Sequence, residues 1–412
     1  MRFTWKPIRV AALSLAAVLA LSAARADTDP AKAYQDILQW RTQQIKEAQG
    51  AKKTIDYRAV MDATAVKAKA AVEGVDATKV EPAKGMEWAQ LFQLAQQPAN
   101  VVAATDRFLT TNPDGAVKFR AQMLEVSAFR QLSDGAGLYK TLNAMTPPDK
   151  TTALQLASLA GNYATEMAEK AGAADTLALL AKADKQVPWD DLKTGREKQQ
   201  ADSVLFTLAS GRADILNSKG KAPEALAALE EGRKRLAPSS PAIRMFDMQI
   251  TAAKLIGAPA PAIVRERGYG EFPGLAACKG KVVLIDFMAH WCGPCKASLP
   301  SMKKLYNDYH SRGLEIVSVT TYYGFLGKEK PLTPDQEFAK MDAFVKEEGM
   351  TWPVAFGPRS NSEAYGVAGI PNFVLIDQTG KVHSVTVGYS PALFASLRKN
   401  VETLLGVKVA LK

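Results

Sequence analysis

The spacing of hydrophobic residues differs between two parts of the chain. From residue 27 to residue 256, apolar side chains recur at intervals of three and four, as at Leu156, Leu159 and Tyr163, which is typical of amphipathic helices. After residue 268, short continuous apolar runs alternate with helical patterns, which is typical of a sheet covered by helices. The sequence therefore predicts an all-helical region over 27–256 and an α/β domain over 269–412.

The helical region predicts pairs of helices joined by short turns. One pair over 203–236 turns at Gly220, and a second over 151–185 turns near Gly172. These pairs resemble tetratricopeptide repeats, but the distance between the two turns departs from the period of about 34 residues that this repeat requires. We therefore predict a degenerate helical repeat. It serves either as a docking surface for partners or substrates, or as a scaffold or dimerisation domain.

Two prolines mark the boundary between these regions. Pro259 and Pro261 alternate with alanine in the segment over 257–268, which follows the last helical pattern. Such a segment stops a helix and stiffens a linker, so a Pro-containing linker is one prediction. The alternative is that the segment packs as the entry to the second domain.

The second part of the chain predicts an alternation of strands and helices. The expected strands cover 282–288, 314–320, 353–356, 372–377 and 381–387. Helices are expected from about residue 296 to residue 309, over 335–349 and over 391–405. The last two strands form a hairpin, because a Gln-Thr-Gly turn separates them.

The first residues have the features of an export signal. Basic residues at positions 2, 6 and 9 precede an apolar run over 10–21, which is short for crossing a bilayer. Ala24 and Ala26 then form a small-x-small cleavage site. We predict a signal peptide over 1–26 that is cleaved after Ala26, which places the mature protein in the periplasm without membrane insertion. An uncleaved anchor is the alternative.

Composition agrees with a globular protein. Of 412 residues, 47% are hydrophobic and 23% are charged, which is enough apolar material for two domains. The formal net charge of +10 includes four basic residues inside the signal segment. Because lysine and arginine do not cluster with aromatic residues, the sequence gives no support to nucleic-acid binding.

Two cysteines stand where a predicted strand passes into a helix. Cys292 and Cys295 follow the apolar run over 282–285 and precede the helical pattern. The first turn of a helix exposes unpaired N–H groups and the positive end of the dipole, so a thiolate there is stabilised and attacks near neutral pH. Pro294 suits the first helical turn. We predict that Cys292 is the nucleophile and that Cys295, deeper in the helix, is the resolving thiol.

Two other uses of a Cys-x-x-Cys pair need consideration. A zinc site requires two further ligands, whereas the chain has only 3 Cys and 3 His and no second close pair. A purely structural disulfide normally closes a longer loop. The sequence therefore favours a redox-active disulfide between Cys292 and Cys295, with no metal and no bound cofactor.

Two stretches resemble a known family. "VVLIDFMAHWCGPCKASLP" and, further on, "YGVAGIPNFVLIDQTGKV" are similar to the TlpA/ResA-like periplasmic thiol-disulfide oxidoreductases, which have a thioredoxin fold. The resemblance covers about residues 257–407 and implies the TlpA-type insertion of an extra strand and helix. The segment 322–334 is long for that insertion. Tyr322, Tyr323 and Phe325 in it either line a substrate groove or pack an irregular loop.

Asp286 lies within the apolar strand before the cysteines. An unpaired carboxylate there is costly, so we expect it to hold its proton to unusually high pH. The resemblance to thioredoxins implies that Asp286 takes the proton of Cys295. It also implies a cis bond before Pro371, which faces the cysteines and frees the backbone of Ile370 to pair with a substrate strand.

The residues around the nucleophile complete the expected site. By the resemblance, Trp291, Gly293 and Pro294 contact substrate. His290 is expected to be exposed and is a candidate modulator of the thiolate. Cys278 is expected to be a small buried hydrophobe, with a regulatory thiol as the alternative.

Two departures from the family pattern refine the functional prediction. Ser298 stands three residues after Cys295, where ResA-like proteins of cytochrome c maturation usually have Glu, and the Gly-Pro dipeptide is that of reducing thioredoxins. Ala289 stands where a peroxiredoxin needs Thr or Ser. We expect an exported protein-disulfide reductase that acts on disulfide-containing exported proteins and receives electrons from a membrane thiol transporter. The alternatives are a disulfide oxidase or isomerase, and a helical-repeat adaptor that uses the thioredoxin fold to bind partners.

Overall fold

The computed structural model describes residues 29–50, 55–192 and 195–407. The predicted signal peptide lies outside these residues. By contacts, the chain divides into two compact units, Met1–Lys193 and Thr194–Lys412. The sequence-based division at residue 256 instead separates helical from mixed composition, and it stays a prediction about which parts fold independently.

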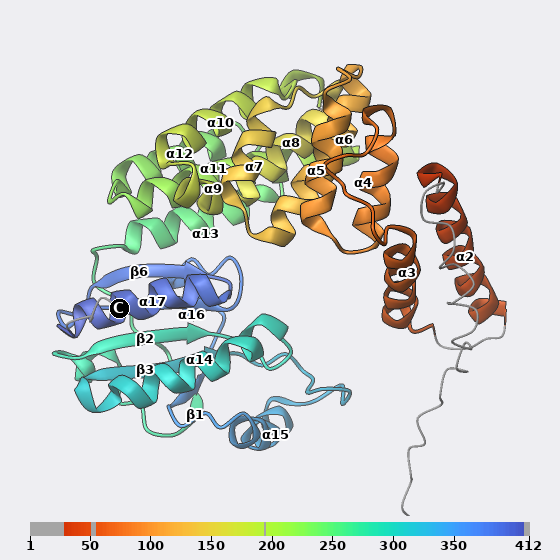
Figure 1. The fold of residues 1–412 in the computed structure, drawn as a ribbon. Helices are drawn as coiled ribbons and strands as arrows, with labels where there is room; N and C mark the ends of the chain where they lie inside the picture. Colours follow the sequence, from red (N-terminus) through yellow and green to blue (C-terminus); the bar gives the residue numbers. More distant parts are fainter. Residues whose placement is uncertain (1–28, 51–54, 193–194, 408–412) are drawn as a thin grey trace, which may run out of the picture. The chain divides into compact units, whose positions relative to one another are not determined.

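The first unit is helical throughout its longer described elements, as predicted. Asp114, Asp134 and Asp149 act as N-caps, because their side chains accept backbone N–H groups of the first helical turn. Figure 1 shows successive helices, such as α5 and α6, side by side. The elements are α2 (Pro30–Gly50), α3 (Tyr57–Ala71), η1 (Pro82–Lys84), α4 (Gly85–Leu94), α5 (Pro98–Leu109), α6 (Gly115–Leu132), α7 (Gly135–Ala144), α8 (Lys150–Asn162), α9 (Ala164–Lys170), α10 (Ala173–Gln186) and η2 (Trp189–Asp191).

The predicted helix pairs differ in how closely they match. The pair over 151–185 contains an additional break, because Tyr163 separates α8 from α9. The pair over 203–236 corresponds to α11 (Gly195–Ser218) and α12 (Ala222–Lys234), with Gly220 in the turn at a φ of 72°. A left-handed φ of this kind favours glycine, so this turn is confirmed.

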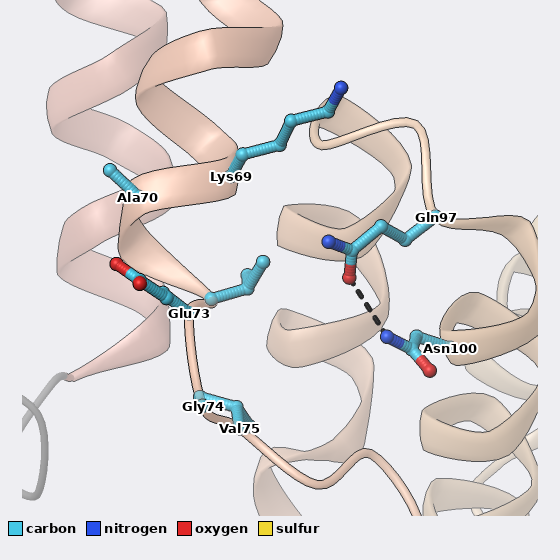
Figure 2. Close-up of a pocket in the computed structure, with 8 residues that line it drawn as sticks. Lys69, Ala70, Glu73, Gly74, Val75, Gln97 and Asn100 are labelled. Carbon is cyan, nitrogen blue, oxygen red and sulfur yellow. Dashed lines mark hydrogen bonds between the residues drawn. The ribbon is translucent and has the colours of Figure 1, made fainter.

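An open pocket lies within the first unit, between the end of α3 and the start of α5. It has a volume of about 480 Å³, and Lys69, Gly74 and Asn100 are among its lining residues. Figure 2 shows the amide of Asn100 donating to the side-chain oxygen of Gln97 at 2.8 Å. No lining residue carries a thiol, and the three cysteines of the chain lie in the second unit.

Helix α13 (Ala242–Leu255) packs against the mixed part of the second unit. A Cβ atom built on Gly366 would lie 2.0 Å from the carbonyl oxygen of Met248, so only glycine allows this approach. Leu255 packs on a core cluster that includes Val283 and Ile285 of the sheet. These contacts explain why the division by contacts falls before α11 rather than after α13.

The proline-containing segment over 257–268 is held by hydrogen bonds. The N–H of Gly257 donates to the carbonyl oxygen of Val382 at 2.7 Å. The Asn361 side chain accepts from the N–H of Val264 at 2.9 Å and donates to its carbonyl oxygen at 2.8 Å. The segment therefore packs as the entry to the mixed domain.

A mixed sheet forms the centre of this domain. Its strand order is β1-β4-β3-β2-β5-β6. Strand β3 pairs parallel with both β2 and β4. The pairs β1–β4, β2–β5 and β5–β6 are antiparallel. The strands are β1 (Arg267–Tyr269), β2 (Val282–Phe287), β3 (Leu314–Thr320), β4 (Val354–Phe356), β5 (Asn372–Ile376) and β6 (Val382–Val387). The last five lie at the predicted positions, and β1 was not predicted.

Side chains of β2 alternate between two apolar cores. Val282 and Leu284 belong to the core formed with helices α14 (Gly293–Tyr309), α15 (Pro334–Glu347) and α17 (Pro391–Leu404). Val283 and Ile285 face the other core, which includes Tyr365 and Val367 after the short helix α16 (Ser360–Ala364). The strand is buried over its whole length, as its continuous apolar run predicted.

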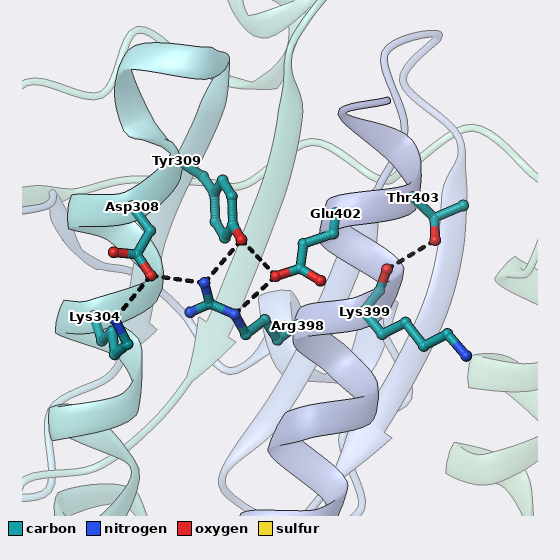
Figure 3. A network of polar contacts seen from close by, with 7 residues as sticks. All are labelled: Lys304, Asp308, Tyr309, Arg398, Lys399, Glu402 and Thr403. Atoms are coloured by element: carbon teal, nitrogen blue, oxygen red, sulfur yellow. Dashed lines mark hydrogen bonds and ion pairs between the residues drawn. The ribbon is translucent and has the colours of Figure 1, made fainter. Parts of the chain in front are cut away.

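A polar network fastens α14 to α17 at the end of α14 remote from the cysteines. Figure 3 shows the guanidinium of Arg398 donating to Asp308 at 2.7 Å, to the hydroxyl of Tyr309 at 2.8 Å and to Glu402 at 2.8 Å. The Tyr309 hydroxyl also donates to Glu402. Because the Arg398 side chain is only 28% exposed, these charge-assisted bonds hold the end of α14 against α17.

Candidate functional site

The cysteine pair lies at the predicted junction of strand and helix. β2 ends at Phe287, and α14 begins at Gly293 with Cys292 as its N-cap residue. Pro294 occupies the first turn, where its missing N–H costs no hydrogen bond. Cys292 and Cys295 form a disulfide.

The sulfur of Cys292 lies among backbone polar groups. The N–H of Cys295 donates to the Sγ atom of Cys292 at 3.1 Å, and the carbonyl oxygen of Ile370 lies 3.7 Å from the same atom. Cys292 is 4% exposed and Cys295 is 1% exposed, whereas Trp291 is 50% exposed. Cys292 is thus the more accessible cysteine, and Trp291 is the exposed side chain next to it.

The bond between Ile370 and Pro371 is cis, as the family resemblance implied. Pro371 is buried and directly precedes β5. The carbonyl oxygen of Ile370 approaches the Cys292 sulfur, so the structure brings these sequence-predicted residues together. A second cis bond precedes Pro331, in the segment between β3 and α15, and it was not predicted.

Asp286 is buried in β2, the strand that precedes the redox pair. It is 1% exposed, and its Oδ2 atom accepts a hydrogen bond from the Ser318 hydroxyl at 2.8 Å. Within the described residues, Oδ1 has no hydrogen-bond partner. Burial raises the pKa of Asp286 to about 7, and the hydrogen bond from Ser318 opposes this shift. The expected buried acid is therefore present, with a pKa in the range useful for proton transfer.

The second half of the chain matches known redox proteins. A family model described as Redoxin matches residues 255–405. The "Thiol-disulfide oxidoreductase ResA" of Geobacillus thermodenitrificans is 31% identical over 137 residues, which cover 33% of this chain and 71% of that protein. The protein of the same name from Bacillus subtilis is 34% identical over 133 residues, which cover 32% of this chain and 67% of that protein.

The chain belongs to the ResA family. It is therefore a thiol-disulfide oxidoreductase with a thioredoxin-like domain. Among solved structures, a thiol:disulfide interchange protein of the thioredoxin family from Chlorobium tepidum is 26% identical, with a TM-score of 0.29, and the match covers 37% of this chain and 97% of that one. The Redoxin match begins at residue 255 and so leaves the helical region before it uncovered.

Ser298 occupies the position at which the family pattern described above usually has Glu. It is 1% exposed, and its hydroxyl donates to the carbonyl oxygen of Cys295 at 2.7 Å. The side chain is thus turned back onto its own helix. It supplies no acidic group to the site of this ResA-family chain.

The expectation that His290 is exposed is wrong. Its side chain is 4% exposed, and its ring packs edge-to-face against Tyr323 at 5.7 Å and Phe325 at 5.1 Å between ring centroids. These aromatic residues come from the insertion after β3, which covers the histidine. Burial lowers the pKa of His290, and the nearby carboxylate of Glu337 opposes that shift.

Glu337 is a site residue that the sequence did not reveal. It lies in the first turn of α15, and its side chain is 1% exposed. The N–H of Tyr323 lies 3.0 Å from both carboxylate oxygens, and the N–H of Gly324 donates to Oε2 at 2.7 Å. The Nε2 atom of His290 lies 3.8 Å from Oε1. Glu337 therefore anchors the insertion over the active site.

Two aromatic residues of the insertion pack in different places. Tyr322 packs against Phe356 in the sheet core, with ring centroids 5.2 Å apart. Tyr323 packs on the cluster that contains both redox cysteines, and its ring lies edge-on to Trp291 with centroids 5.4 Å apart. Tyr323 thus joins the insertion to the exposed tryptophan beside Cys292.

Other candidate groups have no place in this site. Cys278 is 6% exposed and packs in the core on the other face of the sheet, and burial raises its pKa, all of which fits a small hydrophobe. The described residues include no group of His, Cys, Asp and Glu arranged to hold a metal ion. In the same described ranges, no helix is long and apolar enough to span a membrane.

Proposed function

We propose that this chain is an exported reductase of protein disulfides, in which Cys292 attacks the substrate and Cys295 resolves the mixed disulfide. The position of the pair is the observation that carries this proposal. Cys292 is the N-cap of α14 and accepts the N–H of Cys295, whereas Cys295 is the less accessible cysteine. A thiolate at an N-cap gains a hydrogen bond and the favourable end of the helix dipole.

The reaction transfers two electrons from the reduced cysteine pair to the substrate. The thiolate of Cys292 attacks one sulfur of the substrate disulfide, and the other substrate sulfur leaves as a thiolate. Cys295 gives its proton to Asp286 and attacks the Cys292 sulfur, so the remaining substrate sulfur leaves as a second thiolate. The products are a reduced substrate, which takes up protons, and the Cys292–Cys295 disulfide.

Backbone groups beside Cys292 suit an extended substrate segment. Ile370 lies just before β5, and its carbonyl oxygen is 3.7 Å from the Cys292 sulfur, so it is placed to accept a peptide N–H of a substrate segment that approaches this sulfur. Trp291, Gly293 and Pro294 are exposed around the nucleophile. We propose that these residues contact the substrate chain on either side of its cysteine.

Export and electron supply complete the proposal. The basic and apolar pattern over 1–26 supports secretion to the periplasm. Reducing equivalents are scarce in that compartment, so the oxidised pair needs a donor. We propose a membrane thiol transporter as that donor and disulfide-containing exported proteins as the substrates.

Trapping tests the assignment of the two thiols. Cys295→Ala retains the attacking thiol and lacks the resolving one, so it should accumulate mixed disulfides that appear as reductant-sensitive high-mass bands. Cys292→Ala is the matched control and should trap little. If Cys292→Ala forms the adducts and Cys295→Ala does not, the roles are reversed.

The reduction potential tests the direction. A potential near that of thioredoxin, about −270 mV, together with insulin reduction in the presence of dithiothreitol, supports a reductase. A potential near about −120 mV belongs to a strong oxidant and would move the function to disulfide formation.

A further inference from the structure

Asp286 is the end of a short chain of buried hydrogen bonds. Asp286 of β2 lies opposite Ser318 of β3 in the sheet register. The Ser318 hydroxyl lies 2.8 Å from Oδ2 of Asp286, and the Nε1 atom of Trp352 lies 2.9 Å from the Ser318 hydroxyl. Trp352 lies in the segment that leads into β4.

The chemistry of these groups fixes the direction of the chain. An indole N–H only donates, so Trp352 donates to the oxygen of Ser318. The hydroxyl hydrogen of Ser318 is then directed to Asp286. Asp286, Ser318 and Trp352 are 1%, 0% and 2% exposed, so bulk water does not compete for these bonds. The hydroxyl therefore acts as a fixed donor to Oδ2.

The two oxygens of Asp286 consequently differ. Oδ2 is occupied by the fixed donor, whereas Oδ1 is buried and has no partner among the described residues. Strand alternation places Asp286 on the same face as Val282 and Leu284, which pack against α14. Cys295 lies in the first turn of α14, so Oδ1 is the free acceptor on the side of the sheet that carries the resolving cysteine.

We propose that Ser318 and Trp352 are positioning residues for the redox reaction, which hold Oδ2 of Asp286 and leave Oδ1 as the atom that takes the proton of Cys295. This inference rests on the proposed role of Asp286. The step converts the Cys295 thiol and the Asp286 carboxylate into a thiolate and a carboxylic acid. The thiolate then attacks the Cys292 sulfur, and the acid returns its proton to the departing substrate thiolate or to solvent.

Few ionisable groups face Asp286 from the surrounding elements. In β3, Glu315 lies at the far end of the strand and pairs with Lys281, and β5 carries no titratable side chain. The first turn of α14 contributes Cys295 and the exposed Lys296. Helix α15 contributes Glu337, which lies near His290. The charged groups of α17 belong to the network of Figure 3, at the end of α14 remote from the cysteines. Burial and the Ser318 hydrogen bond are the two causes that shift the pKa of Asp286.

Burial and the Ser318 hydrogen bond act on the pKa of Asp286 in opposite directions. The relay from Trp352 through Ser318 to Asp286 can therefore be measured. Burial raises the pKa of Asp286, and the Ser318 hydroxyl lowers it because it stabilises the carboxylate. Loss of the hydroxyl should raise that pKa further and leave less carboxylate at neutral pH. Loss of the indole N–H alone should have a smaller effect in the same direction, because the hydroxyl still reaches Asp286.

The test is the rate of resolution as a function of pH. The reduced protein is mixed with 5,5′-dithiobis(2-nitrobenzoate), and the second release of thionitrobenzoate reports the attack of Cys295 on the mixed disulfide at Cys292. For the unmodified protein, we expect an inflection near pH 7. Ser318→Ala should move it upward by about one pH unit and slow the step at pH 7 by about three- to tenfold, with the rates converging above about pH 9.

Further variants separate positioning from structural effects. Trp352→Phe should shift the inflection by less than Ser318→Ala, and Ser318→Thr should restore it because it keeps the hydroxyl. Ser384→Ala is the matched control, since this hydroxyl is also buried but lies on β6. An infrared titration of the protonated carboxyl band, identified by its loss in Asp286→Asn, should move with the rate profile.

The outcomes distinguish the relay from the proposed function. If Asp286→Asn keeps the inflection, Asp286 is not the proton acceptor, and both the proposed role of Asp286 and the relay fail. If Asp286→Asn removes it but Ser318→Ala and Trp352→Phe leave both the profile and the carboxyl band in place, only the relay is wrong. If Ser318→Ala does not fold, Trp352→Phe and Ser318→Thr still decide the point.

Discussion

Two buried carboxyl groups lie in the mixed domain, and the protein surrounds them differently. Glu337 and Asp286 are each 1% exposed. The carboxylate of Glu337 accepts the N–H groups of Tyr323 and Gly324 and lies 3.8 Å from His290. Asp286 receives only one hydroxyl, and its other oxygen has no partner in the described part of the chain.

This difference suits Glu337 to an anchoring role and Asp286 to the proton transfer proposed for it. A carboxylate with several donors fixes the segments that supply them, so its removal leaves buried N–H groups unpaired. A carboxyl group with one donor has spare acceptor capacity and a raised pKa, which suits proton transfer. Burial is common to both carboxyl groups, so the number of hydrogen-bond donors is the feature that distinguishes them.

The largest expected effect is the loss of stability in Glu337→Ala. Because the N–H groups of Tyr323 and Gly324 lose their acceptor inside the protein, the free energy of unfolding should fall by about 4 kcal/mol. Glu347→Ala, at an exposed position of the same helix, is the control and should change it by less than about 0.5 kcal/mol. Urea unfolding measures both. Similar values for the two variants would mean that Glu337 is not an anchor.

Asp286→Asn should change the free energy of unfolding in the opposite direction. The folded-state pKa of about 7 exceeds the ordinary value of 3.8, so the folded protein binds this proton more tightly than the unfolded chain. The stability from this group is complete below about pH 4 and is lost as pH rises to about 7. At pH 8 we expect Asp286→Asn to raise the free energy of unfolding by about 2 kcal/mol, and at pH 4 we expect no gain. An equal effect at both pH values would contradict the buried charge.

Arg398→Ala tests a region that touches neither carboxyl group. Loss of its bonds to Asp308, Tyr309 and Glu402 should lower the free energy of unfolding by about 1–2 kcal/mol. The pH dependence of thiol resolution should not change, because the network lies at the other end of α14. A shifted pH profile in this variant would show that helix position, rather than local hydrogen bonding, controls Asp286.

The smallest expected effect concerns His290. Burial lowers its pKa below the ordinary value of 6.5, so the folded protein binds this proton less tightly than the unfolded chain. Stability should therefore fall as pH drops below about 6.5. We expect His290→Phe to reduce this acid sensitivity by less than about 1 kcal/mol between pH 6.5 and pH 5, measured by thermal unfolding. An unchanged slope would show that the Glu337 charge offsets the burial.

The sequence predicted the elements that a local pattern determines. A continuous apolar run placed β2 and the buried Asp286, and the strand-to-helix transition placed Cys292 as the N-cap. The cis bond before Pro371 followed from the family motif and not from the residue itself, because most X–Pro bonds are trans. These features depend on short stretches of sequence.

The missed features depend on how distant segments meet. Glu337 follows a Thr-x-x-Gln capping box, and an acid in a first helical turn usually indicates an exposed partner of the helix dipole. His290 is buried only because the insertion after β3 folds over it, and the sequence gives no register for that loop. Ser318 could have indicated a polar partner for Asp286, since it is a polar residue in the apolar strand that pairs with β2.

Alkylation of the reduced protein tests most directly whether Cys292 is the attacking thiol and Cys295 the inner, resolving one. The protein is treated briefly with iodoacetamide between pH 5 and pH 9, and the modified cysteine is identified by peptide mass spectrometry. We expect Cys292 to be modified first at every pH and Cys295 to react only after unfolding or at the highest pH. Faster modification of Cys295 in the folded protein would contradict it.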